Sequence, residues 1–384
     1  MMDDLLSPPP TNSSALQELE TLEKFLKEAR FDAIVDATND ILKKIKLNIE
    51  KVKNTNEEYF ILKFVDFLKR LDAILKSDFS PSIIFMADGK CYSGGLCDLF
   101  RNICWLYLLS KLLNCDFKIC FTYPFNLSEY LTENEHKWYI NREDIINGEA
   151  KKIVVASFDF TGGPQKFENT ETDTVSSKCF VQTISDLVNK YERILCYFHI
   201  KGAKYLHFRE TFFELFSPSQ KLQNNIDANL KKTSEKFVAA HFRFQKLLGD
   251  FKDTVGKTLD DAQKEILIER CINILQEIAE HSGGLKILVC SDSVCFLKAA
   301  KNLDFVFTVD GGKDIIKHTA VANDIDDEDL LKLFTDLFLM SYAERIYTVV
   351  EGDMYGGCFA KTAALLGQTQ YYVVTNGDFE RKDY

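Results

Sequence analysis

The segment His241-Phe242-Arg243 has residue types and spacing suited to chemistry on a phosphate group. It closes an apolar run from Phe237 that predicts a buried strand, and the two-residue period of a strand puts His241 and Arg243 on one side. A guanidinium at the mouth of a parallel sheet can fork onto a diphosphate and stabilise its growing charge as it leaves. His241 could orient the next loop or donate to a phosphate. The alternative is a core histidine beside a surface arginine.

A glycine-rich turn provides a second candidate for anion binding. Gly94 and Gly95 separate the apolar run Ile83 to Met86 from a longer apolar run, Leu99 to Leu113, which predicts a strand-to-helix junction. Backbone N–H groups and the helix dipole favour an anion at such a junction. The turn matches neither the dinucleotide-binding nor the P-loop pattern, so neither function is supported. Two glycines at this point also fit a purely structural turn.

Three further segments in the C-terminal half carry polar groups near predicted strand ends. Ser291 and Asp292 follow an apolar strand, Asp336 lies on a predicted helix, and Gly356-Gly357 precede the final predicted helix. Each has a structural explanation as well, since the serines fit a helix N-cap, Asp336 fits a solvated charge and the glycines fit a tight turn.

In order and spacing, these segments resemble the GDP-fucose-dependent fucosyltransferase superfamily, which includes bacterial α-1,2, nodulation and core α-1,6 enzymes and the protein O-fucosyltransferases. The resemblance covers about residues 81 to 370. Four segments carry it, each similar to a family pattern: Gly94-Gly95-Leu96-Cys97-Asp98 to G-G-L-G-[ND], His241-Phe242-Arg243-Phe244 to H-x-R, Val289-Cys290-Ser291-Asp292-Ser293 to a strand ending in [ST]-D, and Asp336 to Glu344 to D-x-x-x-x-S-x-[AC]-[DE].

The resemblance implies an α/β, GT-B-like fold of two Rossmann-like, doubly wound domains facing a cleft. It implies an inverting glycosyltransferase that moves fucose from GDP-fucose to a glycan or protein hydroxyl, with no metal and no cofactor besides the donor. Arg243 would hold the leaving β-phosphate, and Asp98 would be the first candidate for the general base, with Asp250 and Asp253 as alternatives. The remaining implied site residues are His241, Ser291, Asp292, Asp336, Gly356 and Gly357 around the donor, and Gly94 and Gly95 facing the acceptor and leaving phosphate.

The sequence departs from the family pattern at three places. Cys97 stands where the family usually has glycine, Phe244 replaces a second arginine of several branches, and Gly356-Gly357 occupy the place of a serine pair. Two other functions therefore stay open. One is a transferase of the same fold with another nucleotide sugar as its donor, and the other is a non-catalytic binding or scaffold protein.

The surrounding pattern predicts four segments. Residues 1–14 read as a disordered lead, 15–80 as a helical extension, 81–225 as an acceptor-side Rossmann-like domain and 226–384 as a nucleotide-sugar-binding one, with the polar stretch from Ser217 to Lys236 as the connection. The N-terminal helices fit docking on the body, self-association or partner binding. The predicted elements are strands Ile83–Met86, Phe117–Phe121, Lys152–Ser157, Ile194–Ile200, Phe237–Phe242, Leu285–Cys290, Phe305–Thr308 and Ile346–Val350, and helices Leu99–Leu113, Ala262–His281, Ser293–Lys301, Asp327–Met340 and Phe359–Gly367.

Composition limits the class of protein. With 46% hydrophobic and 27% charged residues the chain can bury two ordinary cores, and a net charge of −11 argues against nucleic acid as a partner. The first residues lack a secretory signal pattern, so we expect a cytoplasmic protein, which a lipid-linked acceptor would bring to a membrane surface. The eleven cysteines are scattered without zinc-site spacing, which predicts free buried thiols.

Overall fold

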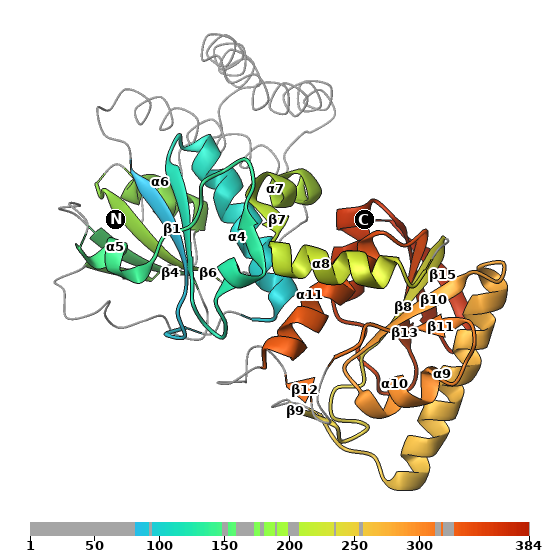
Figure 1. Ribbon diagram of the computed structural model, residues 1–384. Helices are drawn as coiled ribbons and strands as arrows, with labels where there is room; N and C mark the ends of the chain where they lie inside the picture. Colours follow the sequence, from blue (N-terminus) through green and yellow to red (C-terminus); the bar gives the residue numbers. More distant parts are fainter. Residues whose placement is uncertain are drawn as a thin grey trace, which may run out of the picture.

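The computed structural model describes residues 81–91, 94–147, 153–158, 173–176, 180–188, 190–198, 207–233, 236–252, 256–311, 316–317 and 326–383. The predicted N-terminal lead and helical extension lie outside these residues. The described chain is a mixed α/β structure with two parallel sheets (Figure 1). Within the described ranges, no helix combines the length and apolarity needed to cross a lipid bilayer.

The first sheet has five strands in the order β2-β1-β6-β4-β5, all parallel. Its apolar strands are buried on both faces, as expected for a parallel sheet covered by helices. A small antiparallel pair, β3 with β7, lies beside it. The elements of this first unit are β1 (Ser82–Ala87), α4 (Leu96–Leu112), β2 (Asp116–Phe121), η2 (Leu127–Glu129), β3 (Leu131–Glu133), α5 (Arg142–Asn147), β4 (Ile153–Phe158), β5 (Asp173–Ser176), α6 (Phe180–Leu187), β6 (Arg193–Phe198), α7 (Phe208–Leu215) and β7 (Phe216–Pro218).

The second sheet has six strands in the order β11-β10-β8-β13-β14-β15, parallel except for the edge strand β15. A two-stranded parallel pair, β9 with β12, is separate from it. The elements of this second unit are α8 (Gln220–Leu230), β8 (Phe237–Phe242), β9 (Phe251–Lys252), α9 (Asp261–His281), β10 (Lys286–Ser291), α10 (Val294–Ala300), β11 (Val306–Phe307), β12 (Ile316–Lys317), α11 (Asp327–Ser341), β13 (Arg345–Val350), α12 (Phe359–Gly367), β14 (Gln370–Thr375) and β15 (Asp378–Lys382).

One hydrophobic core joins the two sheets. It runs from Phe85 on β1, through helices α4, α7, α8, α11 and α12, to Ala239 on β8. Aromatic rings fill it: Phe100 meets Phe212 edge to face with ring centroids 5.1 Å apart, and Tyr130 stacks on Phe334 at 4.9 Å. The opposite faces of the two sheets have their own smaller cores. The face of β8 that carries Ala239 therefore looks toward α11 and α12.

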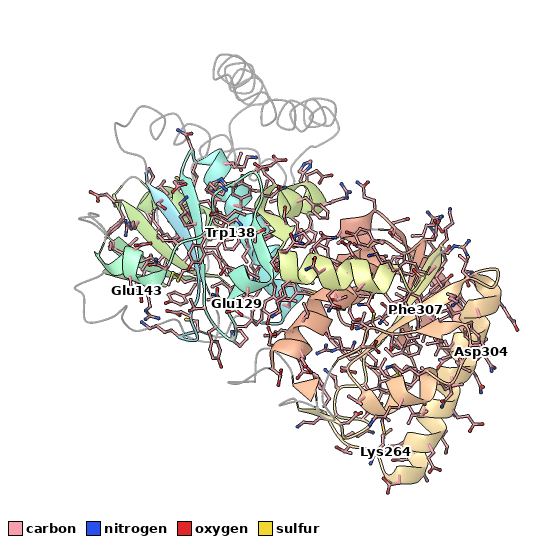
Figure 2. All side chains as sticks on the ribbon, viewed as in Figure 1. Glu129, Trp138, Glu143, Lys264, Asp304 and Phe307 are labelled. Atoms are coloured by element: carbon pink, nitrogen blue, oxygen red, sulfur yellow. The ribbon has the colours of Figure 1, made fainter. Side chains whose placement is uncertain are left out.

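Trp138 shows how tightly the first unit is packed against this core. Trp138 lies within the first unit (Figure 2). Its ring is fully buried, meets Phe216 with centroids 5.4 Å apart, and donates its indole N–H to the Leu215 carbonyl at 2.8 Å. A buried indole with a satisfied N–H contributes both apolar area and a defined orientation. These two contacts of Trp138 hold Leu215 and Phe216, which precede α8.

The predicted strands and helices are present with ends shifted by a few residues at most. The polar stretch predicted as a connection instead contains α8, which Ser219 caps by accepting from the Leu222 N–H at 3.3 Å. Leu222 and Ile226 are its buried apolar residues, four positions apart on one face. The predicted division between residues 225 and 226 falls inside this helix, and the division itself stays a prediction.

Close packing of α12 on α11 depends on Gly367, the last residue of α12. A methyl group there would lie 2.0 Å from the Ser341 carbonyl oxygen, so the two helices would have to separate. We expect Gly367→Ala to lower the free energy of unfolding by about 1–3 kcal/mol, as overpacking typically does. Urea unfolding measures the loss. Gly367→Val, which adds a larger group at the same contact, should lose more; an unchanged unfolding midpoint in both variants would contradict the packing argument.

Candidate functional site

The second sheet changes its winding direction at β8. The chain passes from β8 to β10 and β11 on one side, and then to β13 and β14 on the other. In doubly wound sheets, ligands bind outside the carboxyl ends of the strands at such a switch point. Arg243 follows β8 directly, and Gly356 and Gly357 follow β13, so both lie at this point.

Arg243 carries a charge that the described part of the chain leaves without a partner. Its Nε is buried and makes no hydrogen bond, and no described carboxylate lies within ion-pair distance of its guanidinium. The guanidinium lies over two rings, 5.7 Å from the centroid of Phe251 and 5.9 Å from that of Tyr355. Such rings attract a cation without using its N–H groups, which stay available for an anionic ligand.

Asp292 holds the loop that follows Arg243. Its Oδ1 accepts from the Phe244 N–H at 2.8 Å and its Oδ2 from the Gln245 N–H at 2.9 Å. Burial raises the pKa of Asp292 to about 6, although Arg243 and the two backbone N–H groups pull it down. Since both carboxylate oxygens are engaged, Asp292 positions the Arg243 loop in this structure.

A second acidic residue, Asp250, fixes the start of α10. Its Oδ2 accepts from the Ser293 hydroxyl and from the Cys295 N–H, both at 2.8 Å. Ser293 in turn caps α10 by accepting from the Phe296 N–H, and the Ser291 hydroxyl accepts from the Ser293 N–H. Asp250, one alternative for the general base, is therefore part of a helix cap. Asp253, the other alternative, lies outside the described residues.

Beneath Arg243 lies a buried polar cluster formed by His241, Cys290, Lys332 and Asp336. Lys332 Nζ pairs with Asp336 Oδ2 one turn along α11, and both side chains are over 90% buried. Burial lowers the pKa of Lys332, but the Asp336 carboxylate outweighs it and the pKa stands above its ordinary value. Asp336 is therefore a partner in an internal ion pair, not a solvated charge.

His241 is neutral in this cluster. Burial, with help from the charges of Arg243 and Lys332, lowers its pKa to about 3. The ring packs on Phe359 at 5.5 Å, and its Nδ1 is buried without a hydrogen bond among the described residues. A neutral imidazole beside Arg243 leaves the guanidinium as the cation at the strand end.

The loop after β13 comes within contact distance of the Arg243 side chain. Gly357 has φ of +61°, and a methyl group there would lie 3.3 Å from Arg243 Cδ. Tyr355, 54% exposed, donates its backbone N–H to the Arg243 carbonyl at 3.1 Å. Glycine at 357 thus permits both the left-handed backbone and the close approach.

The glycine turn of the first unit also reaches this region. Gly94 has φ of +78° and Gly95 is the N-cap of α4, which no side chain caps. Cys97 in the first turn of α4 and Cys358, the N-cap of α12, influence each other's ionisation: the pKa of the Cys97 thiol is raised and that of the Cys358 thiol is lowered. The N-terminus of α12 lies next to Arg243, because Gly357 precedes Cys358 and contacts the Arg243 side chain.

Asp98 follows Cys97 and has its carboxylate paired to Arg101 one turn along α4. The pKa of the Cys358 thiol is lowered, first by Cys97 and also by the charges of Arg101 and Arg243, against burial and the charge of Asp98. Asp98 is partly exposed, with 30% of its side chain accessible.

The structure therefore brings together Arg243, His241, Asp292 and Gly357 at one strand edge, with Cys358 linking them to Asp98. Residues that the sequence did not single out also belong here: Lys332, Tyr355 and Phe251. The spacing of Lys332 and Asp336 at i and i+4 was the available signal for the ion pair. In the described ranges, no three His, Cys, Asp or Glu side chains gather closely enough to hold a metal ion.

No family model matches the sequence, and no curated protein matches it. Solved structures similar to the chain are fucosyltransferases. NodZ from Bradyrhizobium is 11% identical, with a TM-score of 0.48, over 79% of this chain and 99% of its own. FUT1 of Arabidopsis thaliana in complex with GDP is 9% identical, with a TM-score of 0.44, over 80% and 74%. POFUT1 in complex with GDP is 12% identical, with a TM-score of 0.46, over 79% and 100%. These TM-scores are below 0.5, so the chemistry of the site itself has to support any function.

The titration of Asp292 makes stability depend on pH in a defined direction. Its pKa is about 6 in the folded protein against 3.8 ordinarily. The stabilisation of the folded state by the protonated carboxyl is therefore complete below about pH 4 and is lost as pH rises to about 6. We expect the free energy of unfolding of the wild type, relative to Asp292→Asn, to fall by about 3 kcal/mol across this window. Urea unfolding at several pH values measures it. The exposed Asp304→Asn should show no such change, and a flat Asp292→Asn difference would contradict the raised pKa.

Proposed function

We propose that this chain is an inverting glycosyltransferase that transfers fucose from GDP-fucose to a glycan or protein hydroxyl. The observation that supports it most is Arg243: a partly buried guanidinium with an unpartnered Nε, at the switch point of a doubly wound sheet. The N-terminus of α12, which no side chain caps, begins at Cys358, one residue after Gly357 at the Arg243 side chain. Together these are positive or partly positive groups converging on one place, which suits a diphosphate.

In the proposed reaction, an acceptor hydroxyl attacks the anomeric carbon of fucose from the face opposite the nucleotide. The bond from that carbon to the β-phosphate oxygen breaks, and its electron pair stays on the diphosphate. Arg243 donates to the phosphate oxygens as this charge develops, which lowers the energy of the transition state more than that of the bound donor. Asp292 keeps the Arg243 loop in place through the Phe244 and Gln245 N–H groups.

Asp98 is the proposed acceptor of the hydroxyl proton. Its carboxylate is partly exposed near the Cys358 end of the site, and its pairing with Arg101 fixes its orientation. Asp250 is less suited, because its Oδ2 is committed to the cap of α10. A base within reach of the acceptor hydroxyl has to come from the α4 side, opposite the leaving diphosphate.

The choice of GDP-fucose over another donor rests on the order and spacing of the four matched segments. Phe244, Gly356 and Gly357 differ from the family pattern and so bear on the identity of the donor. Phe244 is fully buried, so it cannot take the place of the arginine that contacts a ligand in several branches. Melting temperatures in the presence of GDP, UDP, CMP and ADP separate the donors, because a ligand that binds the native state raises the midpoint by mass action. We expect GDP alone to raise it; a rise with UDP or CMP instead would assign another nucleotide sugar.

Replacing Arg243 tests the central group directly. We expect Arg243→Ala to reduce transfer from GDP-fucose about 10²–10³-fold, as loss of one charge-stabilising group does, without lowering the melting temperature. Arg243→Lys keeps the charge but loses the fork, so its activity should lie between the two. A coupled assay for released GDP measures the rates.

The control for this series is Arg381→Ala, which removes an exposed arginine on the edge strand β15. It should transfer fucose at the wild-type rate. Wild-type activity in Arg243→Ala would refute the proposed role, and absence of GDP release by the wild-type protein with any acceptor or with water would favour a non-catalytic binding protein.

Gly357→Ala tests the approach of the β13 loop to Arg243. The added methyl would occupy a left-handed position, at a cost of about 1–2 kcal/mol, and would lie 3.3 Å from Arg243 Cδ. We expect lower stability together with weaker GDP binding and slower transfer. Gly352→Ala is matched to it, since φ is +57° there but nothing lies within 4 Å of the methyl. It should lose similar stability and keep its transfer rate; equal loss of transfer in both would contradict the contact.

A further inference from the structure

Tyr355 is the exposed one of the two aromatic residues that contact the Arg243 guanidinium. Its ring centroid lies 5.9 Å from Arg243 Cζ, and that of Phe251 lies 5.7 Å from the same atom. Phe251 is 6% exposed, whereas Tyr355 is 54% exposed. A ligand that reaches Arg243 from solvent therefore arrives beside the ring of Tyr355.

The backbone of Tyr355 is held from both sides. Its N–H donates to the Arg243 carbonyl at 3.1 Å, and Met354 before it is buried in the core beside β8. After it, a methyl group on Gly356 would lie 3.3 Å from Val350 Cγ2, so the chain passes close to the end of β13. The place from which the Tyr355 side chain starts is therefore well defined.

Gly357 lies between the ring of Tyr355 and the stem of Arg243. A methyl group on Gly357 would lie 3.3 Å from Arg243 Cδ, and 3.6 and 3.7 Å from Cε1 and Cδ1 of Tyr355. One point in space is thus within van der Waals distance of both side chains. Tyr355 therefore bounds the space in which the Arg243 side chain can turn.

Exposure alone does not distinguish Tyr355. Tyr139, Ile266 and Tyr342 are exposed to a similar degree, and single exposed apolar side chains are normal on a protein surface. Tyr355 has a further property, because the guanidinium under its ring has a buried Nε without a hydrogen-bond partner among the described residues. A role for this ring has to act through that guanidinium.

A ring over a guanidinium acts on its orientation more than on the stability of the fold. The attraction between an exposed ring and a cation is weak, and it leaves the N–H groups free to donate. Arginine has many rotamers, so fixing its side chain when an anion binds costs conformational entropy. A ring that holds the guanidinium before binding removes part of that cost, and the anion binds more tightly.

We propose that Tyr355 is a positioning residue, whose ring holds the Arg243 guanidinium ready to receive a diphosphate. The face of the ring exerts this effect, and the phenol hydroxyl is not needed for it. The effect on binding requires only an anion at Arg243. The effect on the transfer step rests on the proposed function, in which Arg243 donates to the leaving phosphate.

Binding of inorganic pyrophosphate to the full-length protein, measured by isothermal titration calorimetry, tests the ring without a transfer assay. We expect Tyr355→Leu to weaken binding about 2–5-fold, which corresponds to about 0.5–1 kcal/mol, because leucine has no π face. Tyr355→Phe restores the face and should recover most of the lost affinity. The melting temperature without ligand should stay unchanged in both variants, since the replaced side chain is exposed.

The kinetic constants give a second test where transfer is observed. Arg243 donates most strongly as charge develops on the leaving diphosphate, so a misaligned guanidinium should lower kcat more than it raises KM. We expect Tyr355→Leu to lower kcat about 10-fold or more, with a smaller change in KM for GDP-fucose. Tyr342→Leu is the matched control, because Tyr342 has similar exposure at the end of α11, and it should keep the wild-type constants.

Equal pyrophosphate affinity in Tyr355→Leu and the wild type would overturn the proposal. A loss that Tyr355→Phe does not recover would also overturn it, since the hydroxyl would then be the acting group. A lower melting temperature in Tyr355→Leu without ligand would do the same, because the ring would then support the fold. If the effect on pyrophosphate appears while the wild type transfers no fucose, the positioning role stands and the proposed function fails. If fucose is transferred while Tyr355→Leu behaves as the wild type, the function stands and the positioning role fails.

Discussion

The C-terminal unit holds the guanidinium of Arg243 with its Nε buried and without a hydrogen-bond partner among the described residues. Leaving a buried donor unsatisfied costs about 1–3 kcal/mol, and more for a charged group. The faces of Phe251 and Tyr355 offset part of this cost without consuming the N–H groups of Arg243. The proposed anionic ligand would supply the hydrogen-bond partner that this donor lacks at the sheet switch point.

The groups around Arg243 hold it in place and do not neutralise it. The charge of Arg243 lowers the pKa of Asp292, but burial raises it more. Both carboxylate oxygens of Asp292 accept from backbone N–H groups, those of Phe244 and Gln245, which follow Arg243. Lys332 is compensated by Asp336, and His241 stays neutral, so neither competes for the same anion with a charge of its own. The position of the guanidinium is thus set by hydrogen bonds to its loop, while its charge remains available.

Strand and helix positions could be predicted because apolar periodicity is a local property of the sequence. The helix α8 was missed because only Leu222 and Ile226 mark its buried face within a polar stretch. The partners of Asp292 and Asp250 could not be predicted, since a carboxylate near a strand end looks the same whether it faces a ligand or a backbone N–H. The mutual effect of Cys97 and Cys358 on their pKa values could not be predicted either, because the two residues lie far apart in the sequence, on α4 and at the start of α12.

The shared core also limits how the site can open. Apolar side chains from both sheets and from α4, α7, α8, α11 and α12 form one cluster, and a large apolar interface opposes rotation of one unit against the other. Gly367 against Ser341 fixes α12 on α11 in the same way. Ligand exchange then has to come from local change in the segments that carry the site. The segment from Tyr355 to Cys358 is suited to it, since Tyr355 is exposed, whereas Met354 before it is buried in the core against β8 and Asp353 pairs with Lys257. A change in that loop moves the wall against which Arg243 packs, so access and charge stabilisation are coupled through one segment.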